Sequence, residues 1–252
     1  MPHDTVALRT QDGICQTHVF SPENAAALPG VLFFMDGLGI RPALFEMGER
    51  MAAGGYCVVL PDLYYRSGFT KGAQLFQDPK IREEWQKSVL PTVSAAKIMS
   101  DVPSFLEYLD SRSDVLPGSI AVTGYCLGGR LSFTAAGTFP DRIAAAASYH
   151  ASHLATDAPD SPHRLAPQIK ARVYVAGATD DPGFDDAQKE RLERALTEAN
   201  VDHKVETYNA RHGWVPSDTP VHDEAAAEKH WRTLFALLEQ TLKGVPSSPL
   251  PE

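Results

Sequence analysis

Residues 124–129 read Gly-Tyr-Cys-Leu-Gly-Gly, with Cys126 near the middle of the run. A short apolar segment, 119–123, precedes the run, and a segment with helical character, 130–136, follows it. Gly124 and Gly128 flank the cysteine at two positions either way and relieve the crowding of a sharp turn between a strand and a helix. The pattern is typical of a nucleophile elbow with cysteine in place of the usual serine. It predicts Cys126 as a nucleophile.

Apolar runs alternate with helix-like segments along most of the 252 residues. We expect strands at 31–35, 56–60, 120–122, 143–148, 172–176 and 204–208, and helices at 41–53, 92–110, 127–138 and 185–199. Most of these strand runs are continuously apolar, as in parallel strands that are buried on both faces. The order of elements predicts the α/β class, as a single-domain α/β-hydrolase fold with a mostly parallel central sheet and helices on both faces.

The remaining segments give further expectations. Residues 6–20 predict one or two antiparallel edge strands, and residues 64–90, which lack a clear period, predict an excursion over the active-site face. Thr219 is expected to cap the last helix, with Pro220 at its first position. An apolar stripe on that helix should face the core; it consists of Trp231, Leu234, Phe235, Leu238 and Leu242. We expect one domain over residues 1–243 and a flexible tail over 244–252.

Composition narrows the possible functions. The net charge of −9 argues against nucleic acid and anionic membranes as partners, because both attract basic surfaces. No apolar run is long enough to span a bilayer, and the first residues lack the basic and apolar regions of a signal peptide. The three widely spaced cysteines fit neither a disulfide framework nor a zinc site. A reducing cytoplasm is therefore the expected location.

Two later loops hold the partners that a nucleophile on an elbow needs. In this fold the acid follows a late strand and the base follows the last strand. Asp180 and Asp181 follow the strand predicted at 172–176, and His212 follows the one at 204–208. Because the carboxyl ends of parallel strands meet at one edge of the sheet, Cys126, one of these aspartates and His212 should lie together. Either aspartate could be the acid.

Each group has a chemical role in such a site. His212 would take the thiol proton and later protonate the leaving oxygen, while the aspartate would orient the imidazole and stabilise its charged form. An imidazolium and a helix N-terminus both favour the thiolate of Cys126. The N–H of Leu127, the residue after the nucleophile, would donate to the oxyanion. A second donor should come from the loop 36–39, after the first central strand.

These motifs, together with Pro61-Asp62-Leu63-Tyr64 and His212-Gly213-Trp214, resemble the dienelactone hydrolase family over roughly residues 31–242. The resemblance implies a Cys-His-Asp triad, no metal or cofactor, and hydrolysis of an ester or a lactone. It places the acid on Asp181 and the second oxyanion donor on Gly37. It also places on Asp36 the family's carboxylate that engages the resting thiol, although Asp36 is one methylene shorter than the family's glutamate.

The substrate is less clearly indicated. The family's founding enzymes bind a substrate carboxylate with arginines, one of them a few residues after the histidine, where this chain has Val215-Pro216-Ser217. A neutral ester or lactone is therefore as good a prediction as a dienelactone. Thioesters, phosphotriesters and a non-catalytic binding or sensor role remain alternatives. The expected partner is a small molecule, and the protein is expected to be a monomer or a homodimer.

For some residues the sequence allows a role in packing as well as a role in the site. Cys15 and Cys57 lie in strand-like runs and are expected to be small buried residues. His150 follows the strand predicted at 143–148 and is expected either to line the pocket or to pack in the core. Trp214 and Trp85 could wall the pocket or serve only as packing.

Overall fold

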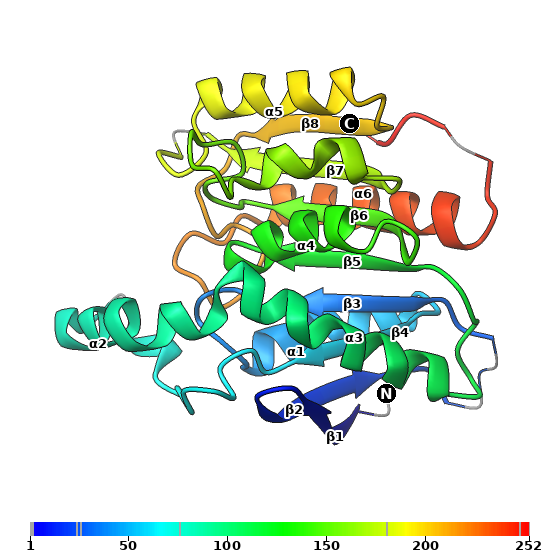
Figure 1. Cartoon of the computed structure of the whole chain (residues 1–252), viewed down its shortest axis with the longest axis horizontal. Coiled ribbons are helices and arrows are strands. Elements are labelled where there is room, and N and C mark those ends of the chain that lie inside the picture. Colours follow the sequence, from blue (N-terminus) through cyan, green and yellow to red (C-terminus); the bar gives the residue numbers. More distant parts are fainter. Residues whose placement is uncertain are drawn as a thin grey trace. The chain divides into compact units, whose positions relative to one another are not determined.

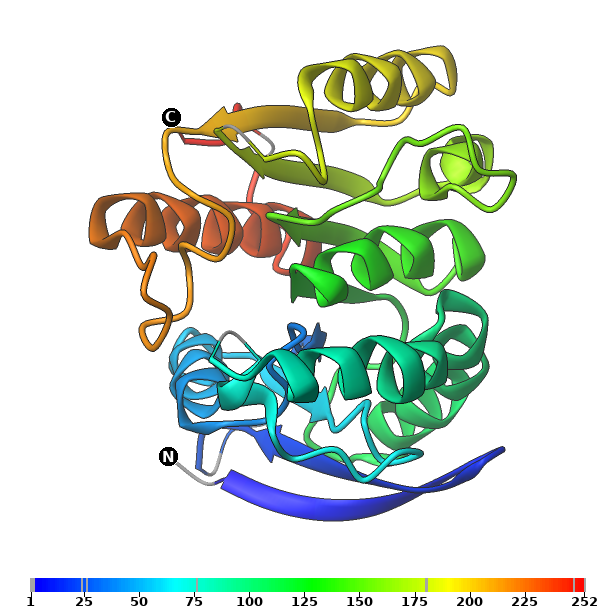
Figure 2. The ribbon, with the colours of Figure 1, turned by 90° about the vertical axis from the view of Figure 1, so that its left-hand side faces the viewer.

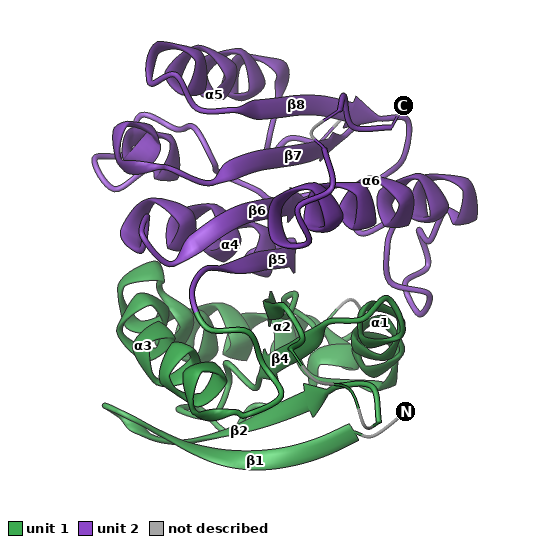
Figure 3. Ribbon diagram, turned by 90° about the vertical axis from the view of Figure 1, so that its right-hand side faces the viewer, with its two compact units in different colours: residues 1–117 green, residues 118–252 purple. Residues whose placement is uncertain are grey.

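The computed structural model describes residues 3–23, 25, 27–75, 77–179, 181–246 and 248–251. The chain divides into two compact units, residues 1–117 and residues 118–252 (Figure 3). A domain over residues 1–243 and a flexible tail over 244–252 both stay predictions. Among the described residues, no helix is both long enough and apolar enough to cross a membrane.

Unit 1 contains a mixed set of strands with helices packed against them (Figure 1). Its strands lie in the order β1-β2-β4-β3, with β1–β2 and β2–β4 antiparallel and β3–β4 parallel. The hairpin of β1 and β2 confirms the antiparallel strands expected from residues 6–20. Helix α1 packs against β2 and β4, and α3 packs against β1. The longer elements are β1 (His3–Thr10), β2 (Gly13–Phe20), β3 (Gly30–Phe34), α1 (Pro42–Ala53), β4 (Cys57–Pro61) and α3 (Ala95–Ser111).

Short helical turns occupy much of the segment 64–90, for which the sequence showed no period. They are η1 (Gly72–Gln74), α2 (Pro79–Glu84), the π-helical turn η2 (Trp85–Val89) and η3 (Leu90–Val93). No residue of α2 is buried, so this helix carries no apolar stripe that a sequence pattern could reveal. The Asp78 side chain caps α2 by accepting the N–H of Lys80. The position of this segment over the active-site face stays a prediction.

Unit 2 contains parallel strands in the order β5-β6-β7-β8. Helices α4 and α5 lie on one side of these strands and α6 on the other (Figure 2). The expected parallel sheet with helices on both faces is therefore found in this unit. Its elements are β5 (Ile120–Tyr125), α4 (Leu127–Thr138), β6 (Ile143–Tyr149), η4 (Pro162–Gln168), β7 (Arg172–Ala178), α5 (Asp186–Glu198), β8 (His203–Tyr208) and α6 (Glu224–Leu242).

The start of α6 differs from the sequence prediction. Asp223 caps the helix by accepting the N–H of Ala226 at 2.9 Å. Thr219 instead donates its hydroxyl to the carbonyl oxygen of Gly213 at 2.8 Å, within the loop that leads to the helix. The prediction of Thr219 as the cap was therefore wrong, because a nearby turn takes its side chain. Of the predicted apolar stripe, Trp231, Leu234 and Leu238 are buried in the core, whereas Phe235 and Leu242 are half-buried.

Candidate active site

Cys126 lies on a strained turn between β5 and α4. Its φ of +53° and ψ of −113° form a conformation that residues other than glycine rarely adopt. Gly124 permits the close crossing of strand and helix, because a Cβ there would lie 2.2 Å from the carbonyl oxygen of Gly128. The Cys126 N–H donates to the carbonyl oxygen of Tyr149 at 2.9 Å and ties the turn to β6. This is the geometry of the expected elbow.

The three cysteines differ in their surroundings. Cys15 and Cys57 are fully buried, as expected, whereas Cys126 is half-buried. Burial raises the pKa of Cys15 to about 12 and that of Cys57 to about 11, so both stay protonated and inert at neutral pH. Accessibility on a turn distinguishes Cys126 from the other two.

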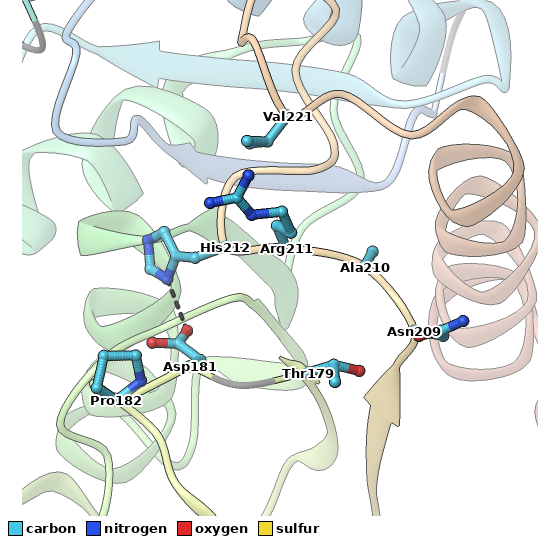
Figure 4. Close-up of a pocket in the computed structure, with 8 residues that line it drawn as sticks. All are labelled: Thr179, Asp181, Pro182, Asn209, Ala210, Arg211, His212 and Val221. Atoms are coloured by element: carbon cyan, nitrogen blue, oxygen red, sulfur yellow. Dashed lines mark hydrogen bonds and ion pairs between the residues drawn. The ribbon is translucent and has the colours of Figure 1, made fainter.

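Asp181 and His212 face each other from loops that follow neighbouring parallel strands. Asp181 follows β7 and His212 follows β8, so both lie at the carboxyl edge of unit 2. The His212 ring turns toward Asp181, and its Nδ1–H donates to Oδ2 at 2.7 Å (Figure 4). The Gly183 N–H donates to Asp181 Oδ1 at 2.9 Å and fixes the carboxylate. Asp180, the alternative acid, lies outside the described residues.

Hydrogen bonds set the charges of this pair. Burial disfavours charge on His212, but hydrogen bonds with Asp181 and Cys126 outweigh it and raise the pKa of His212 to about 10. Burial also disfavours charge on Asp181, yet the bond with His212 brings the pKa of this carboxyl below its ordinary value of 3.8. The Asp181 carboxylate thus favours the imidazolium form of His212.

Both predicted oxyanion donors have a free N–H. The N–H of Leu127 is the first of α4, where no intrahelical acceptor exists. Neither this N–H nor that of Gly37, in the loop after β3, has an acceptor among the described residues. Buried or half-buried backbone donors are normally paired, so a free N–H at a predicted site is available for a ligand oxygen.

Asp36 is buried at the end of β3 and is bound by Arg41. The Arg41 guanidinium donates to both carboxylate oxygens, at 2.7 and 2.8 Å, and the Leu38 N–H donates to Oδ1 at 2.9 Å. These bonds make Asp36 an anchor of its own loop. The contact between Asp36 and the resting thiol, which the family resemblance implied, stays a prediction.

His150 and Trp214 are buried beside His212. The ring centroid of His150 lies 5.2 Å from that of His212 and 4.9 Å from that of Trp214. Burial first, and then the neighbouring His212, hold the pKa of His150 well below its ordinary value of 6.5. Neither ring nitrogen of His150 has a partner among the described residues. Trp214 also stacks on Tyr208 at 5.0 Å, so its contacts are those of packing.

The dienelactone hydrolase family profile matches residues 15–242. The chain belongs to the dienelactone hydrolase family. Its relatives include a *Synechocystis* protein named "Putative carboxymethylenebutenolidase", which is 26% identical over 231 residues, or 90% of this chain and 92% of that one. An *Escherichia coli* K12 protein of the same name is 23% identical over 91% of this chain and 83% of its own length.

Solved structures show the α/β-hydrolase fold of this dienelactone hydrolase family member. A "Putative Dienelactone Hydrolase" from *Klebsiella pneumoniae* has a TM-score of 0.81 at 20% identity, covering 95% of this chain and 98% of that one. A dienelactone hydrolase-like promiscuous phosphotriesterase from metagenomic libraries has a TM-score of 0.76, also at 20% identity and with the same coverage. At this level of identity the likeness establishes the fold alone.

A pocket of about 590 Å³ adjoins His212 in this family member (Figure 4). Its lining comes mainly from the loops after β7 and β8: Thr179, Asp181, Pro182, Asn209, Ala210, Arg211, His212 and Val221. Arg211 is exposed, and its guanidinium makes no ion pair with a described residue. The sequence shows no arginine shortly after His212, but Arg211 directly precedes it and gives the pocket a cation. No group of three metal-ligating side chains occurs within the described ranges.

Proposed function

We propose that this protein hydrolyses small-molecule esters or lactones through an acyl-enzyme on Cys126. The observation that carries the proposal is the hydrogen bond of His212 with Asp181 at the carboxyl edge of unit 2, together with the strained strand–helix turn that carries Cys126 in the same unit. A nucleophile, a base that takes its proton and an acid that orients the base are the three groups that acyl-transfer catalysis uses. Membership of the family supports the same reaction class.

Acylation would begin with attack of the Cys126 Sγ thiolate on the ester carbonyl carbon. The carbonyl electron pair moves to oxygen, and the N–H groups of Leu127 and Gly37 donate to the resulting oxyanion. When the tetrahedral intermediate collapses, the bond to the leaving oxygen breaks and imidazolium His212 gives that oxygen its proton. The alcohol leaves, or in a lactone stays attached to the acyl group, and a thioester remains on Cys126.

Deacylation would use the neutral His212 that acylation leaves behind. His212 takes a proton from water as the water oxygen attacks the thioester carbonyl. The same N–H groups stabilise the second oxyanion, and its collapse breaks the carbon–sulfur bond. The products are a carboxylic acid and the Cys126 thiolate beside imidazolium His212, so the starting charge distribution is restored.

A cysteine nucleophile is also compatible with substrates other than esters and lactones. A thiolate also attacks thioesters and phosphotriesters, and one structural neighbour is named a phosphotriesterase. Arg211 beside the pocket favours substrates that carry a negative group. The partner in each case is a small molecule. A reducing compartment such as the cytoplasm would keep the Cys126 thiol reduced. The proposed reaction is compatible with a monomer and with a homodimer.

The Cys126→Ala variant tests the proposal, with Cys57→Ala as the matched control. Both proteins and the wild type would be assayed on aryl esters, lactones, thioesters and phosphotriesters, each with and without a carboxylate. We expect C126A to lose turnover of esters or lactones and C57A to keep it. Ester turnover retained in C126A would overturn the proposal. Labelling of Cys126 by iodoacetamide in a protein without any turnover would favour a binding or sensor role.

A further inference from the structure

The loop that carries Gly37 is held by a hydrogen-bond relay that starts at Trp85. The indole Nε1–H of Trp85 donates to the hydroxyl oxygen of Tyr64 at 2.8 Å. That hydroxyl in turn donates to the carbonyl oxygen of Gly37 at 2.7 Å. The Trp85 ring also covers Gly37, since a Cβ on this glycine would lie 3.4 Å from Cζ2 of the indole. All three residues belong to unit 1.

The rest of the loop is fixed independently of this relay. The Gly39 N–H donates to the carbonyl oxygen of Asp36 at 3.1 Å and closes a turn. The Asp36 side chain accepts the N–H of Leu38. Gly72 lies so close to the loop that a Cβ on it would be 1.6 Å from the carbonyl oxygen of Leu38. Tyr64 therefore acts on the peptide that follows Gly37: its hydroxyl holds the carbonyl oxygen, and the Asp36 carboxylate holds the N–H of the same peptide.

The N–H of Gly37 itself has no acceptor among the described residues. Glycine has the widest backbone freedom of any residue, so a glycine donor needs support on both sides to keep its direction. The carbonyl of Asp36 fixes the peptide before Gly37, and Tyr64 fixes the peptide after it. Catalysis by an oxyanion donor depends on such fixed orientation, because the donor then needs no reorganisation during the reaction.

We propose that Tyr64 and Trp85 are positioning residues that orient the Gly37 N–H toward the oxyanion. This inference rests on the proposed function, in which Gly37 supplies the second donor. Tyr64 acts on Gly37 through its hydroxyl, and Trp85 acts through Tyr64 and by covering the glycine. Neither side chain exchanges a proton with the substrate.

Trp85 lies on a part of unit 1 that is otherwise exposed. It begins the π-helical turn η2, directly after α2, which has no buried residue. Side-chain contacts of this segment include a hydrogen bond from the Arg82 Nε–H to the carbonyl oxygen of Leu75 at 3.0 Å and an ion pair of Lys71 with Glu84 at 2.9 Å. The half-buried Trp85 thus links the placement of an exposed helix to the orientation of a predicted donor.

The test compares two reactions of Cys126 in the Tyr64→Phe and Trp85→Phe variants and in the double variant. Acylation by an aryl ester forms an oxyanion, whereas alkylation by iodoacetamide needs the thiolate and forms none. We expect Y64F to slow acylation roughly 10- to 100-fold, since a misplaced group can cost up to about 10² in rate. W85F should slow it less, and the loss in Y64F/W85F should be smaller than the product of the two single losses, because Trp85 acts partly through Tyr64. Alkylation should keep its wild-type rate in all variants.

Tyr65→Phe is the matched control for a lost hydroxyl. Tyr65 belongs to the same unit, and its hydroxyl bonds to Thr10 at 2.7 Å and to Asp101 at 3.0 Å, away from the loop. Y65F should lose stability without a change in acylation. An acylation rate in Y64F equal to that of the wild type would overturn the positioning role of Tyr64 and Trp85. An equal fall in the rates of acylation and alkylation would also overturn it. A wild-type protein that is alkylated but never acylated would overturn the proposed function, and the relay with it.

Discussion

Among the groups that raise the pKa of His212, Asp181 contributes most. In Asp181→Asn the amide keeps the size of the side chain but does not stabilise an imidazolium. We expect kcat/KM to fall by roughly 10²–10⁴. The pKa of His212 should fall from about 10 toward its ordinary value of 6.5. Because the imidazolium protonates the leaving oxygen, the alkaline decline of activity should begin at lower pH than in the wild type.

The measurement is kcat/KM against pH for an alkyl ester, whose poor leaving group requires that proton. An aryl ester with an acidic phenol serves as the control substrate and should show a weaker alkaline decline. If kcat/KM declined at the same alkaline pH in D181N and in the wild type, Asp181 would not be the residue that raises the pKa of His212.

His150 makes stability depend on pH in the opposite direction to His212. Its pKa is depressed in the folded state, so below about pH 6.5 the unfolded chain binds a proton that the folded chain does not. The free energy of unfolding therefore falls as pH falls through this range, by at most about 1.4 kcal/mol per pH unit from this group. We expect His150→Phe to remove this loss while keeping an aromatic ring against His212 and Trp214.

Urea denaturation of H150F and the wild type at about pH 7.5 and about pH 5.5 checks this expectation. The wild type should lose more stability than H150F between the two pH values. An equal loss in both proteins would show that His150 binds its proton as readily in the folded state as in the unfolded chain.

The crossing of β5 and α4 depends on Gly124. A Cβ at this position meets backbone atoms of Gly128, at 2.2 Å from oxygen and 2.3 Å from carbon, and backbone yields little. We expect Gly124→Ala to cost about 3 kcal/mol of stability or more and to abolish activity, since it moves the turn that carries Cys126. In Gly177→Ala, on β7, the nearest atoms are the end of the Lys189 side chain and the Phe184 ring. This control should cost less in thermal or urea denaturation, and equal costs would contradict the account.

The elements that could be predicted are those with a repeating pattern. Strands β3 to β7 follow from largely apolar runs, because strands buried on both faces need such runs. The expectation that Cys126, Asp181 and His212 lie in loops after successive strands follows from their order in the sequence. Parallel strands end at one edge of a sheet, so these loops share that edge. The residue that caps α6 was not predicted correctly, because Thr219 and Asp223 are both residues of a capping type and the path of the preceding loop decides between them.

Contacts between loops were not predictable. The ion pair of Asp36 with Arg41 and the relay from Trp85 to Tyr64 join residues whose spacing carries no period. Arg211 was not predicted as a pocket cation, because the family resemblance places such an arginine after His212 and not before it. Such contacts depend on the course of each loop, which local sequence patterns do not determine.

For the whole molecule the sequence predicts one domain, although the chain divides into units 1–117 and 118–252. Differential scanning calorimetry distinguishes the two possibilities. A single domain should unfold in one transition, with equal calorimetric and van't Hoff enthalpies. Two separable transitions would show that the compact units unfold independently and would contradict the prediction.

The central claim is that Cys126 becomes acylated during turnover. The direct measurement is peptide mass spectrometry after the protein reacts with an acetyl aryl ester and is quenched with acid within the first turnover. The account predicts an acetyl group on Cys126 in the wild type and none on the C126A variant. Ester turnover without an acetyl group on Cys126, or with one on another residue only, would contradict it.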